Sequence, residues 1–248
     1  MPKSTAQLPE WERVLSAAAR LQGILPEAVL VGGTASAIFA GHRMSVDADH
    51  VITDLRDRFD VVLEQLESVA GWQTARVKRP VLILGSLDGI ETGVRQLIRT
   101  APLETRDLSY LGHSIRVPSE GEILRIKGVL ILKRNATRDY LDFVALADHL
   151  GDEQVASALE PFDRLYPQSS GESALQQLAV QLAQPLPYDL DQVDLSEYKR
   201  LAGRWQSWDA IRIHSAHLST VIFDQVCELR TRGGHGVENS NRTPEPGR

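Results

Sequence analysis

Two aspartates separated by one residue are the part of this sequence best suited to do chemistry. Asp47 and Asp49 lie in the segment SVDADHVIT (45–53), whose alternation of apolar and polar residues predicts a β-strand. Alternate residues of a strand leave the same face, so the two Cα atoms would lie about 6.6 Å apart. Carboxylates at that spacing can bind Mg²⁺, which keeps positions for water and substrate phosphates, and Mn²⁺ is the alternative ion. The pair could hold one ion or two.

A glycine pair upstream adds to this signal, because a bare D-x-D is common on exposed strands. AVLVGG (28–33) is typical of a buried strand running into a turn at Gly32 and Gly33, and 34–43 is a predicted helix with Thr34 as its N-cap. Free N–H groups at the start of a helix favour a phosphate. A tight turn that simply needs glycine is the alternative. The segment is not a Walker A loop, because no G-K-[ST] follows it.

Several polar residues surround this strand and turn. Ser45 precedes Asp47 by two residues on the same predicted face, which would put its hydroxyl near the phosphates, unless it is only a polar residue at the start of the strand. Arg43 ends the predicted helix, where a cation is favoured, and could also reach phosphate. His50 points to the opposite face and is interpreted as structural.

Two helices are predicted downstream, at 119–134 and 137–150, with only Asn135 and Ala136 between them. Lys127 has apolar neighbours at helical spacing, so its stem can pack while its ammonium reaches a cleft. Arg134 follows on nearly the same face. Asp139 and Asp142 are three residues apart and share one side of the second helix. Asp139 could equally be a first-turn acid that the helix dipole favours.

Two segments resemble a known family. VLVGGTASAIFAGHRMSVDADHV resembles the signature of the polymerase-β-like nucleotidyltransferases, and LRIKGVLILKRNATRDYLDFVAL resembles the C-terminal motif of the AbiEii-type nucleotidyltransferases, which include toxins of bacterial toxin–antitoxin pairs. The resemblance covers about residues 25–150. It implies metal binding by Asp47, Asp49 and a third acid, and binding of triphosphate oxygens by Lys127. It also implies that Asp139 or Asp142 lies in the active site, and it suggests nucleotide contacts from Gly32, Gly33, Thr34, Arg43, Ser45, Lys127 and Arg134.

The third acid is the least regular part of the match. In the strand-like run IETGVRQLI, Glu91 stands where the superfamily more often has aspartate. Asp88 is close by, but it precedes Gly89 in a predicted hairpin turn, which explains it structurally. Glu91 is therefore the predicted third ligand, and the choice between Glu91 and Asp88 stays open.

The elements that would position these residues predict an α+β protein. Helices at 8–22 and 55–69 and β-rich runs through 72–117 predict a nucleotidyltransferase-fold mixed sheet with flanking helices over 1–117. Helical periodicity broken by prolines predicts a helical domain over 118–232. The last segment, 233–248, has too few apolar residues to fold and is predicted to be a disordered tail.

Composition excludes several other classes of protein. The chain has 248 residues, 42% of them hydrophobic and 24% charged, which is ordinary for a soluble globular protein. No apolar run approaches about 18 residues, so no membrane partner is expected. The N-terminus lacks a signal-like apolar run, so a cytoplasmic location is expected. Cys227 is the only cysteine, and the net charge is −6, which argues against nonspecific wrapping of nucleic acid.

The expected function is Mg²⁺-dependent transfer of a nucleoside monophosphate from a nucleoside triphosphate to an acceptor hydroxyl. A tRNA acceptor is suggested by two groups of cations, Arg76, Lys78 and Arg79 beside the sheet and Lys133, Arg134 and Arg138 at the helix junction. The family resemblance adds a cognate antitoxin as a partner. The alternatives are a small-molecule or protein acceptor, and a scaffold that binds nucleotide without catalysis.

Overall fold

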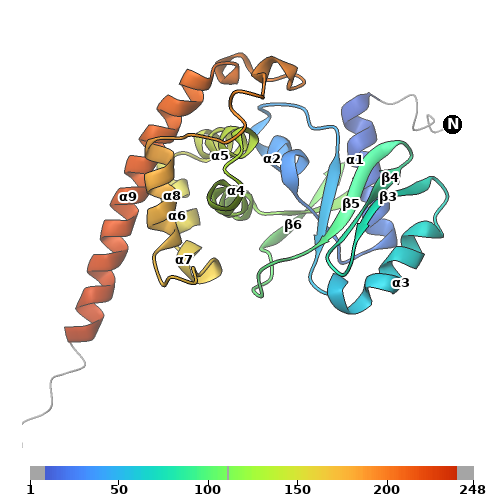
Figure 1. Ribbon diagram of the computed structural model, residues 1–248, viewed down its shortest axis with the longest axis horizontal. Helices are drawn as coiled ribbons and strands as arrows, with labels where there is room; N and C mark the ends of the chain where they lie inside the picture. The colour runs from blue at the N-terminus through green and yellow to red at the C-terminus, as the bar shows by residue number, and fades with distance from the viewer. Residues whose placement is uncertain (1–8, 111, 239–248) are drawn as a thin grey trace, which may run out of the picture.

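The protein consists of an α+β half followed by a helical half, which confirms the predicted fold class. The computed structural model describes residues 9–110 and 112–238. The sheet and its helices occupy one side of the molecule and the C-terminal helices the other, with the long helix α9 along the outer edge (Figure 1). The functional residues predicted from the sequence come from both halves.

The main sheet has five strands in the order β1-β2-β5-β4-β3. Its strands are β1 (Val29–Leu30), β2 (Ala48–Ile52), β3 (Trp72–Lys78), β4 (Leu82–Leu87) and β5 (Ile90–Gln96). β2 and β5 are parallel, whereas the other neighbouring pairs are antiparallel, so the sheet is mixed as predicted. The predicted hairpin turn is present, because Asp88 and Gly89 both have positive φ and connect Leu87 directly to its partner Ile90.

One face of this sheet is covered by helices. Leu21 of α1 (Glu10–Ile24), Leu25 directly after it, and Phe59, Val62 and Leu66 of α3 (Leu55–Glu67) pack against the inward residues of β3, β4 and β5. A separate hairpin of β6 (Thr105–Tyr110) and β7 (His113–Pro118) continues this layer beside α1. Its strands agree with the predicted hairpin, although residue 111 of the turn lies outside the described residues. The other face of the sheet is left for the cleft.

The elements around the glycine pair differ from the prediction in their boundaries. Helix α2 runs from Gly32 to Ala40 with Val31 at its N-cap, so the predicted start at Thr34 is wrong. The Thr34 hydroxyl instead donates a hydrogen bond to the carbonyl oxygen of Asp47. The predicted strands 28–33 and 45–53 are shorter, because the chain leaves β1 to begin a helix and enters β2 only after the Thr34 contact.

The first helix after the β6–β7 hairpin begins at Glu120, one residue after the start of the helix predicted at 119–134. Ser119 caps α4 (Glu120–Arg134) by accepting a hydrogen bond from the backbone N–H of Glu122, and Asn135 in a left-handed conformation separates α4 from α5 (Thr137–Leu150). The rest of this half comprises α6 (Asp152–Leu159), α7 (Phe162–Leu165), α8 (Ala174–Ala183), η2 (Leu195–Glu197), η3 (Gly203–Trp205) and α9 (Trp208–Glu238). α9 thus continues into the predicted tail, and residues 239–248 lie outside the described residues.

The hydrophobic core of the helical half extends into the first half. Ala35 of α2 is fully buried and belongs to the hydrophobic cluster that α4, α5, α6, α8 and α9 form, and Phe39 of α2 packs against the same cluster. Residues of α2 therefore join two halves that the sequence suggested were separate, because α2 contacts β2 on one side and α4 and α5 on the other.

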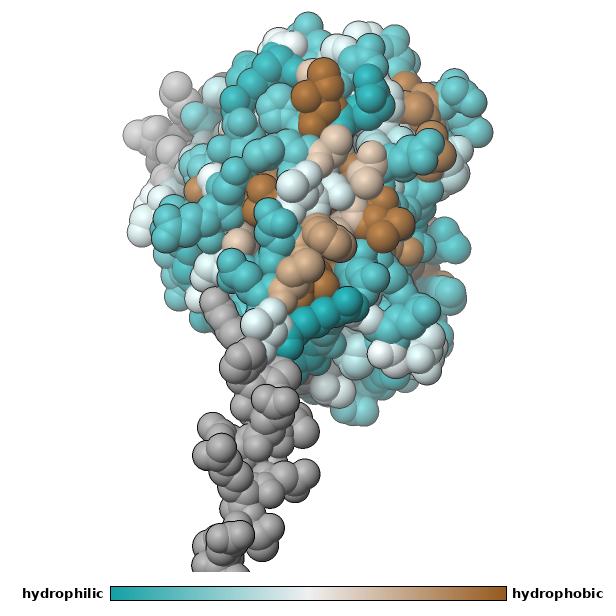
Figure 2. All heavy atoms as spheres, turned by 90° about the vertical axis from the view of Figure 1, so that its left-hand side faces the viewer, coloured by the Kyte–Doolittle hydropathy of each residue, from teal (hydrophilic) through white to brown (hydrophobic). Residues whose placement is uncertain are grey.

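The outer face of the helical half is mostly hydrophilic, with separate apolar patches (Figure 2). Large apolar side chains that are exposed in this half include Val180, Leu186, Tyr188, Ile213 and Phe223. Exposed apolar residues of this kind are ordinary on a globular protein. The cleft between the halves is the better candidate for function.

Candidate functional site

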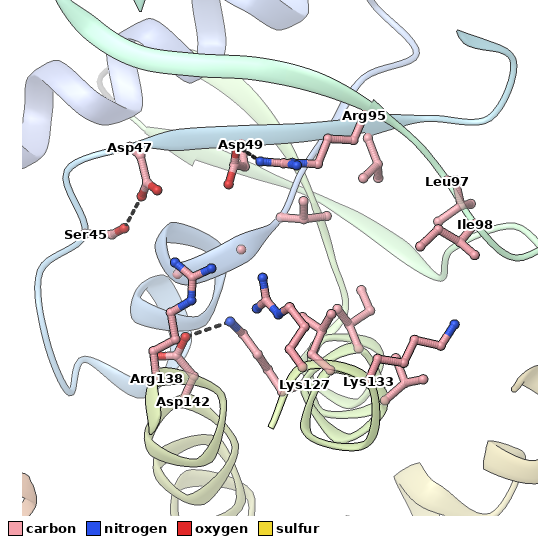
Figure 3. Close-up of a pocket in the computed structure, with 18 of the residues that line it drawn as sticks. Ser45, Asp47, Asp49, Arg95, Leu97, Ile98, Lys127, Lys133, Arg138 and Asp142 are labelled. Atoms are coloured by element: carbon pink, nitrogen blue, oxygen red, sulfur yellow. Dashed lines mark hydrogen bonds and ion pairs between the residues drawn. The ribbon is translucent and has the colours of Figure 1, made fainter. Parts of the chain in front are cut away.

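A cleft of about 1550 Å³ lies between the open face of the sheet and the helices α4 and α5. The carboxylates of Asp47 and Asp49 point into it from the sheet, and Lys127, Arg138 and Asp142 approach from the two helices opposite (Figure 3). The two sequence segments that carry the family resemblance therefore meet across one cleft.

The aspartate pair has the orientation predicted for it, although only Asp49 lies within β2. Asp47 directly precedes the strand, and the Ser45 hydroxyl donates a hydrogen bond of 2.6 Å to its Oδ1 atom (Figure 3). Burial raises the pKa of Asp49, Arg95 opposes this shift, and the charge of Asp47 adds to it. Because the Asp47 carboxylate lies nearby, a cation bound at Asp49 would reduce the electrostatic repulsion between the two negative charges.

Glu91 lines the same cleft but does not complete a three-acid cluster. β2 and β5 pair in parallel with Ala48 beside Thr92, so Glu91 shares the open face with Asp47 and Asp49. Across residues 9–110 and 112–238, no three His, Cys, Asp or Glu side chains lie close enough together to hold an ion. Asp88 is outside the cleft, where it forms an ion pair with Arg20.

The residues present fit Mg²⁺ held by two carboxylates. Mg²⁺ is commonly bound by one or two protein carboxylates, with water and substrate phosphates as its remaining ligands. Asp47 and Asp49 supply such a pair, and their oxygen donors suit this hard cation. Glu91 would reach an ion only through a movement of its exposed side chain or through water.

The glycine pair allows close approach at the start of α2. Gly32 has a φ of 75°, which favours glycine, and both glycines line the cleft. A Cβ atom on Gly33 would collide with the guanidinium of Arg43 and lie 3.1 Å from the Ser45 hydroxyl. The N–H groups of the first turn have no partners within a helix, and the two glycines are the residues of this turn at which an anion in the cleft could accept their hydrogen bonds.

A buried carboxylate holds the cations opposite. Asp142 is fully buried and accepts hydrogen bonds from His42 Nε2 at 2.7 Å and from Arg43 Nε at 2.8 Å, and its other oxygen lies 2.7 Å from Lys127 Nζ. Burial alone would raise the pKa of Asp142, but the charges of Lys127 and Arg43 hold the pKa well below its ordinary value. Asp142 therefore remains ionised and fixes two cations at the edge of the cleft.

Asp139 and Asp142 have different positions, which the sequence did not distinguish. Both are fully buried, but only Asp142 lines the cleft, whereas Asp139 accepts two hydrogen bonds of 2.6 and 3.0 Å from Arg134. Of the residues suggested to bind nucleotide, Gly32, Gly33, Arg43, Ser45, Lys127 and Arg134 line the cleft. Thr34 does not, because it is buried against Asp47.

The cleft is basic although the chain as a whole is acidic. Ten Lys and Arg side chains line it against five Asp and Glu, the cations being Arg43, Arg76, Arg95, Arg99, Lys127, Lys133, Arg134, Arg138, Arg164 and Lys199. Of the cations suggested to contact tRNA, Lys78 and Arg79 lie outside this lining, and Arg79 forms an ion pair with Asp60. The other four border the cleft as predicted.

Among the cleft residues that sequence reasoning missed, Arg95 and Tyr198 contact residues of the predicted site. Arg95 reaches back along β5 until its Nη2 atom lies 3.8 Å from Asp49 Oδ1 (Figure 3). Tyr198, from the segment between α8 and α9, lies 5.4 Å from the Arg43 guanidinium. This segment is tied to the start of the site by hydrogen bonds from Met44 N to Lys199 O and from Ala202 N to His42 O. No local pattern pointed to Tyr198.

Comparison with known proteins gives limited sequence matches. No protein-family model matches the chain. It is 30% identical over 209 residues to the heme uptake protein MmpL11 of Mycobacterium tuberculosis, a match that covers 71% of this chain and 20% of that protein. It is 29% identical over 179 residues to the mycolic acid-containing lipids exporter MmpL11 of Mycolicibacterium smegmatis, covering 71% and 16%. The chain thus spans about a fifth or less of the length of these relatives.

In the described part of the chain, no helix combines the length and apolar character needed to cross a membrane.

Solved structures with a similar arrangement include three proteins of 12–19% sequence identity. A protein of H. pylori described as a nucleotidyltransferase has a TM-score of 0.47 and 17% identity, covering 90% of this chain and 99% of that one. ANT(2'')-Ia, solved with adenylyl-2''-tobramycin, has a TM-score of 0.46 and 12% identity, covering 62% and 97%. An antigenic nucleotidyltransferase-like protein of Paracoccidioides brasiliensis has a TM-score of 0.44 and 19% identity, covering 65% and 90%.

Proposed function

We propose that this chain is a Mg²⁺-dependent nucleotidyltransferase of the polymerase-β-like superfamily, which moves a nucleoside monophosphate from a nucleoside triphosphate to an acceptor hydroxyl. The observation that carries this proposal is the pair Asp47 and Asp49 facing the anchored cations Arg43 and Lys127 across one cleft. A magnesium–triphosphate needs both features, because its metal binds carboxylates while its remaining negative charge needs cations.

The chemistry follows from these positions. The acceptor hydroxyl attacks the α-phosphorus, the bond from this phosphorus to the β-phosphate oxygen breaks, and pyrophosphate leaves with the electron pair. When bound by Asp47 and Asp49, Mg²⁺ would neutralise phosphate charge and orient the α-phosphate. Lys127 and Arg43 would stabilise charge that builds on the leaving pyrophosphate. Glu91, the acid on the same face of the sheet, would take the proton of the acceptor.

The acceptor and the biological role are finer parts of the proposal. We infer a tRNA acceptor from the excess of cations in the cleft and a toxin role, with a cognate antitoxin, from the AbiEii-type motif. A cationic small molecule is a poor fit for this lining, because it would be repelled. A small neutral molecule or a protein acceptor would be the outcome if tRNA were not modified.

The deciding experiment incubates the purified protein with each α-labelled nucleoside triphosphate and total tRNA, with and without Mg²⁺. Label transferred to tRNA and Mg²⁺-dependent release of pyrophosphate would support the whole proposal. Pyrophosphate release without labelled tRNA would retain the enzyme and remove the acceptor. No pyrophosphate with any nucleotide would leave a non-catalytic scaffold.

Lys127→Ala is expected to weaken binding of the triphosphate by about tenfold or more, because a charged hydrogen bond is worth roughly 1.5–3 kcal/mol. Mn²⁺ affinity without nucleotide should stay near the wild-type value, because a charged lysine is not a metal ligand. The affinities can be measured by calorimetry and electron paramagnetic resonance, with Lys78→Ala, an exposed lysine of β3 outside the cleft, as control. Equal loss of both affinities would instead indicate that α4 and α5 had shifted.

The tRNA proposal predicts a salt-dependent affinity that depends on unpaired cations of the cleft. Arg76 and Lys133 line it, and neither forms an ion pair within the described residues. Replacing both with alanine should reduce the slope of log affinity against log salt by about one to two units, because each phosphate contact contributes nearly one. The double variant Lys78→Ala, Arg79→Ala should keep the wild-type slope. A tRNA affinity that is independent of salt would exclude tRNA as the acceptor.

A further inference from the structure

Arg95 differs from the other charged residues on the sheet side of the cleft in what it contacts. Its guanidinium lies 3.8 Å from Asp49 Oδ1, a carboxylate assigned above to the metal, and no hydrogen bond joins the two. By contrast, Arg43 and Lys127 are held at 2.7–2.8 Å by Asp142, which is fully buried. Arg95 is therefore loosely held, and its side chain is 46% exposed.

The register of the sheet explains how Arg95 reaches Asp49. Gly93 is the residue of β5 directly beside Asp49, and Arg95 lies two residues further along the same face, beside Val51. Since Gly93 has no side chain, nothing from β5 stands between the Arg95 guanidinium and the Asp49 carboxylate.

Binding of a divalent cation to Asp49 would change this contact. A metal ion on the carboxylate repels the guanidinium, and a weak, half-exposed ion pair offers little resistance to separation. The released guanidinium stays on the open face of the sheet, where the triphosphate would lie against Asp47, Asp49 and the start of α2. The planar guanidinium group can donate two parallel hydrogen bonds to a pair of phosphate oxygens.

We propose that Arg95 is a triphosphate-binding residue that stays paired with Asp49 until a divalent cation binds the Asp49 carboxylate. This inference rests on the proposed function. It assigns Arg95 two opposite effects: it competes with the metal in the absence of nucleotide, and it binds the phosphates once the metal is present. An arginine with a purely structural role would have neither effect. A positive charge without the planar guanidinium group would attract the phosphates but would not donate paired hydrogen bonds to them.

The test measures two affinities on the full-length chain. The first is for Mn²⁺ without nucleotide, by electron paramagnetic resonance. The second is for inorganic tripolyphosphate at saturating Mg²⁺, by calorimetry, which avoids the unidentified base. Arg95→Ala should bind Mn²⁺ about threefold more tightly, as expected for loss of a half-exposed ion pair, and tripolyphosphate about tenfold or more weakly.

Two further variants distinguish the charge of Arg95 from the shape of its guanidinium group, and both from the effect of removing any arginine. Arg95→Lys should keep Mn²⁺ affinity near the wild-type value, because its charge is retained, and should bind tripolyphosphate with intermediate affinity, because it lacks the planar guanidinium group. Arg56→Ala removes an exposed arginine of α3 outside the cleft and should change neither affinity. Thermal unfolding midpoints check that every variant is folded.

The outcomes distinguish this inference from the proposed function. If the wild type binds neither Mn²⁺ nor tripolyphosphate, the proposed function fails and takes the role of Arg95 with it. If the wild type binds both and Arg95→Ala has unchanged tripolyphosphate affinity, the role of Arg95 alone is overturned. A parallel loss of both affinities in Arg95→Ala would show a structural role and would also overturn it.

Discussion

Asp49→Ala is expected to lower nucleotidyl transfer by about a thousandfold or more while the protein remains folded. Loss of a metal ligand removes several kcal/mol of transition-state stabilisation, and each 1.36 kcal/mol is a factor of ten in rate. Stability should be retained because Asp49 is a partly buried carboxylate with a raised pKa beside Asp47, so its removal relieves repulsion. Pyrophosphate release measures the rate, and the thermal unfolding midpoint measures stability.

A control variant at another aspartate distinguishes loss of the metal ligand from loss of one negative charge. Asp57 is exposed in the first turn of α3 and lies outside the cleft, so Asp57→Ala should retain the wild-type rate. A normal turnover rate in folded Asp49→Ala would remove this pair from catalysis. A large fall in the Asp57→Ala rate would show that the assay responds to overall charge instead.

Asp142→Ala is expected to lower the free energy of unfolding by about 3–5 kcal/mol, because it leaves buried cations without their partner. The cations are Lys127 and Arg43, and His42 loses the same acceptor. Urea unfolding measures this loss. Triphosphate binding should fall as well, since the two cations lose the carboxylate that holds them at the cleft.

The control for this prediction is an ion pair at the surface. Asp148 pairs with Arg204, whose side chain is more than half exposed, so Asp148→Ala should cost at most about 1 kcal/mol. The lowered pKa of Asp142 also predicts how the stability of the folded protein changes with pH. Because the folded pKa lies well below the ordinary value of about 3.9, the stabilisation is present above that value and is lost as the pH falls toward the folded pKa. Equal stability losses in the two variants would contradict the buried network.

Features that depend on neighbouring residues could be predicted from the sequence alone. The periodicity of 119–134 and 137–150 identified α4 and α5 almost to the residue, and Asp88-Gly89 identified a hairpin turn. The common direction of Asp47 and Asp49 followed from their spacing. These features are local, because helical periodicity, turn conformation and strand alternation depend on side chains only a few positions apart.

The boundaries around the site were less predictable because contacts distant in sequence determine them. The hydrogen bond from Thr34 to Asp47 joins the first turn of α2, which begins at Gly32, to the residue directly before β2. The sequence pattern showed a strand and a helix but not this bond. A local reading therefore assigned Thr34 to capping and possible nucleotide contact, whereas its hydroxyl is used inside the fold.

The composition of the site was decided by tertiary structure. Asp139 and Asp142 lie on the same side of α5, and only the packing of α2 and α4 against that side puts Asp142 at the cleft. Arg95 reaches Asp49 because parallel pairing puts Gly93 beside it. Tyr198 reaches Arg43 from far along the chain. The sequence by itself determined which chemical groups this protein has and the helices and strands that carry them. Their partners depended on the three-dimensional packing of segments that no local pattern relates.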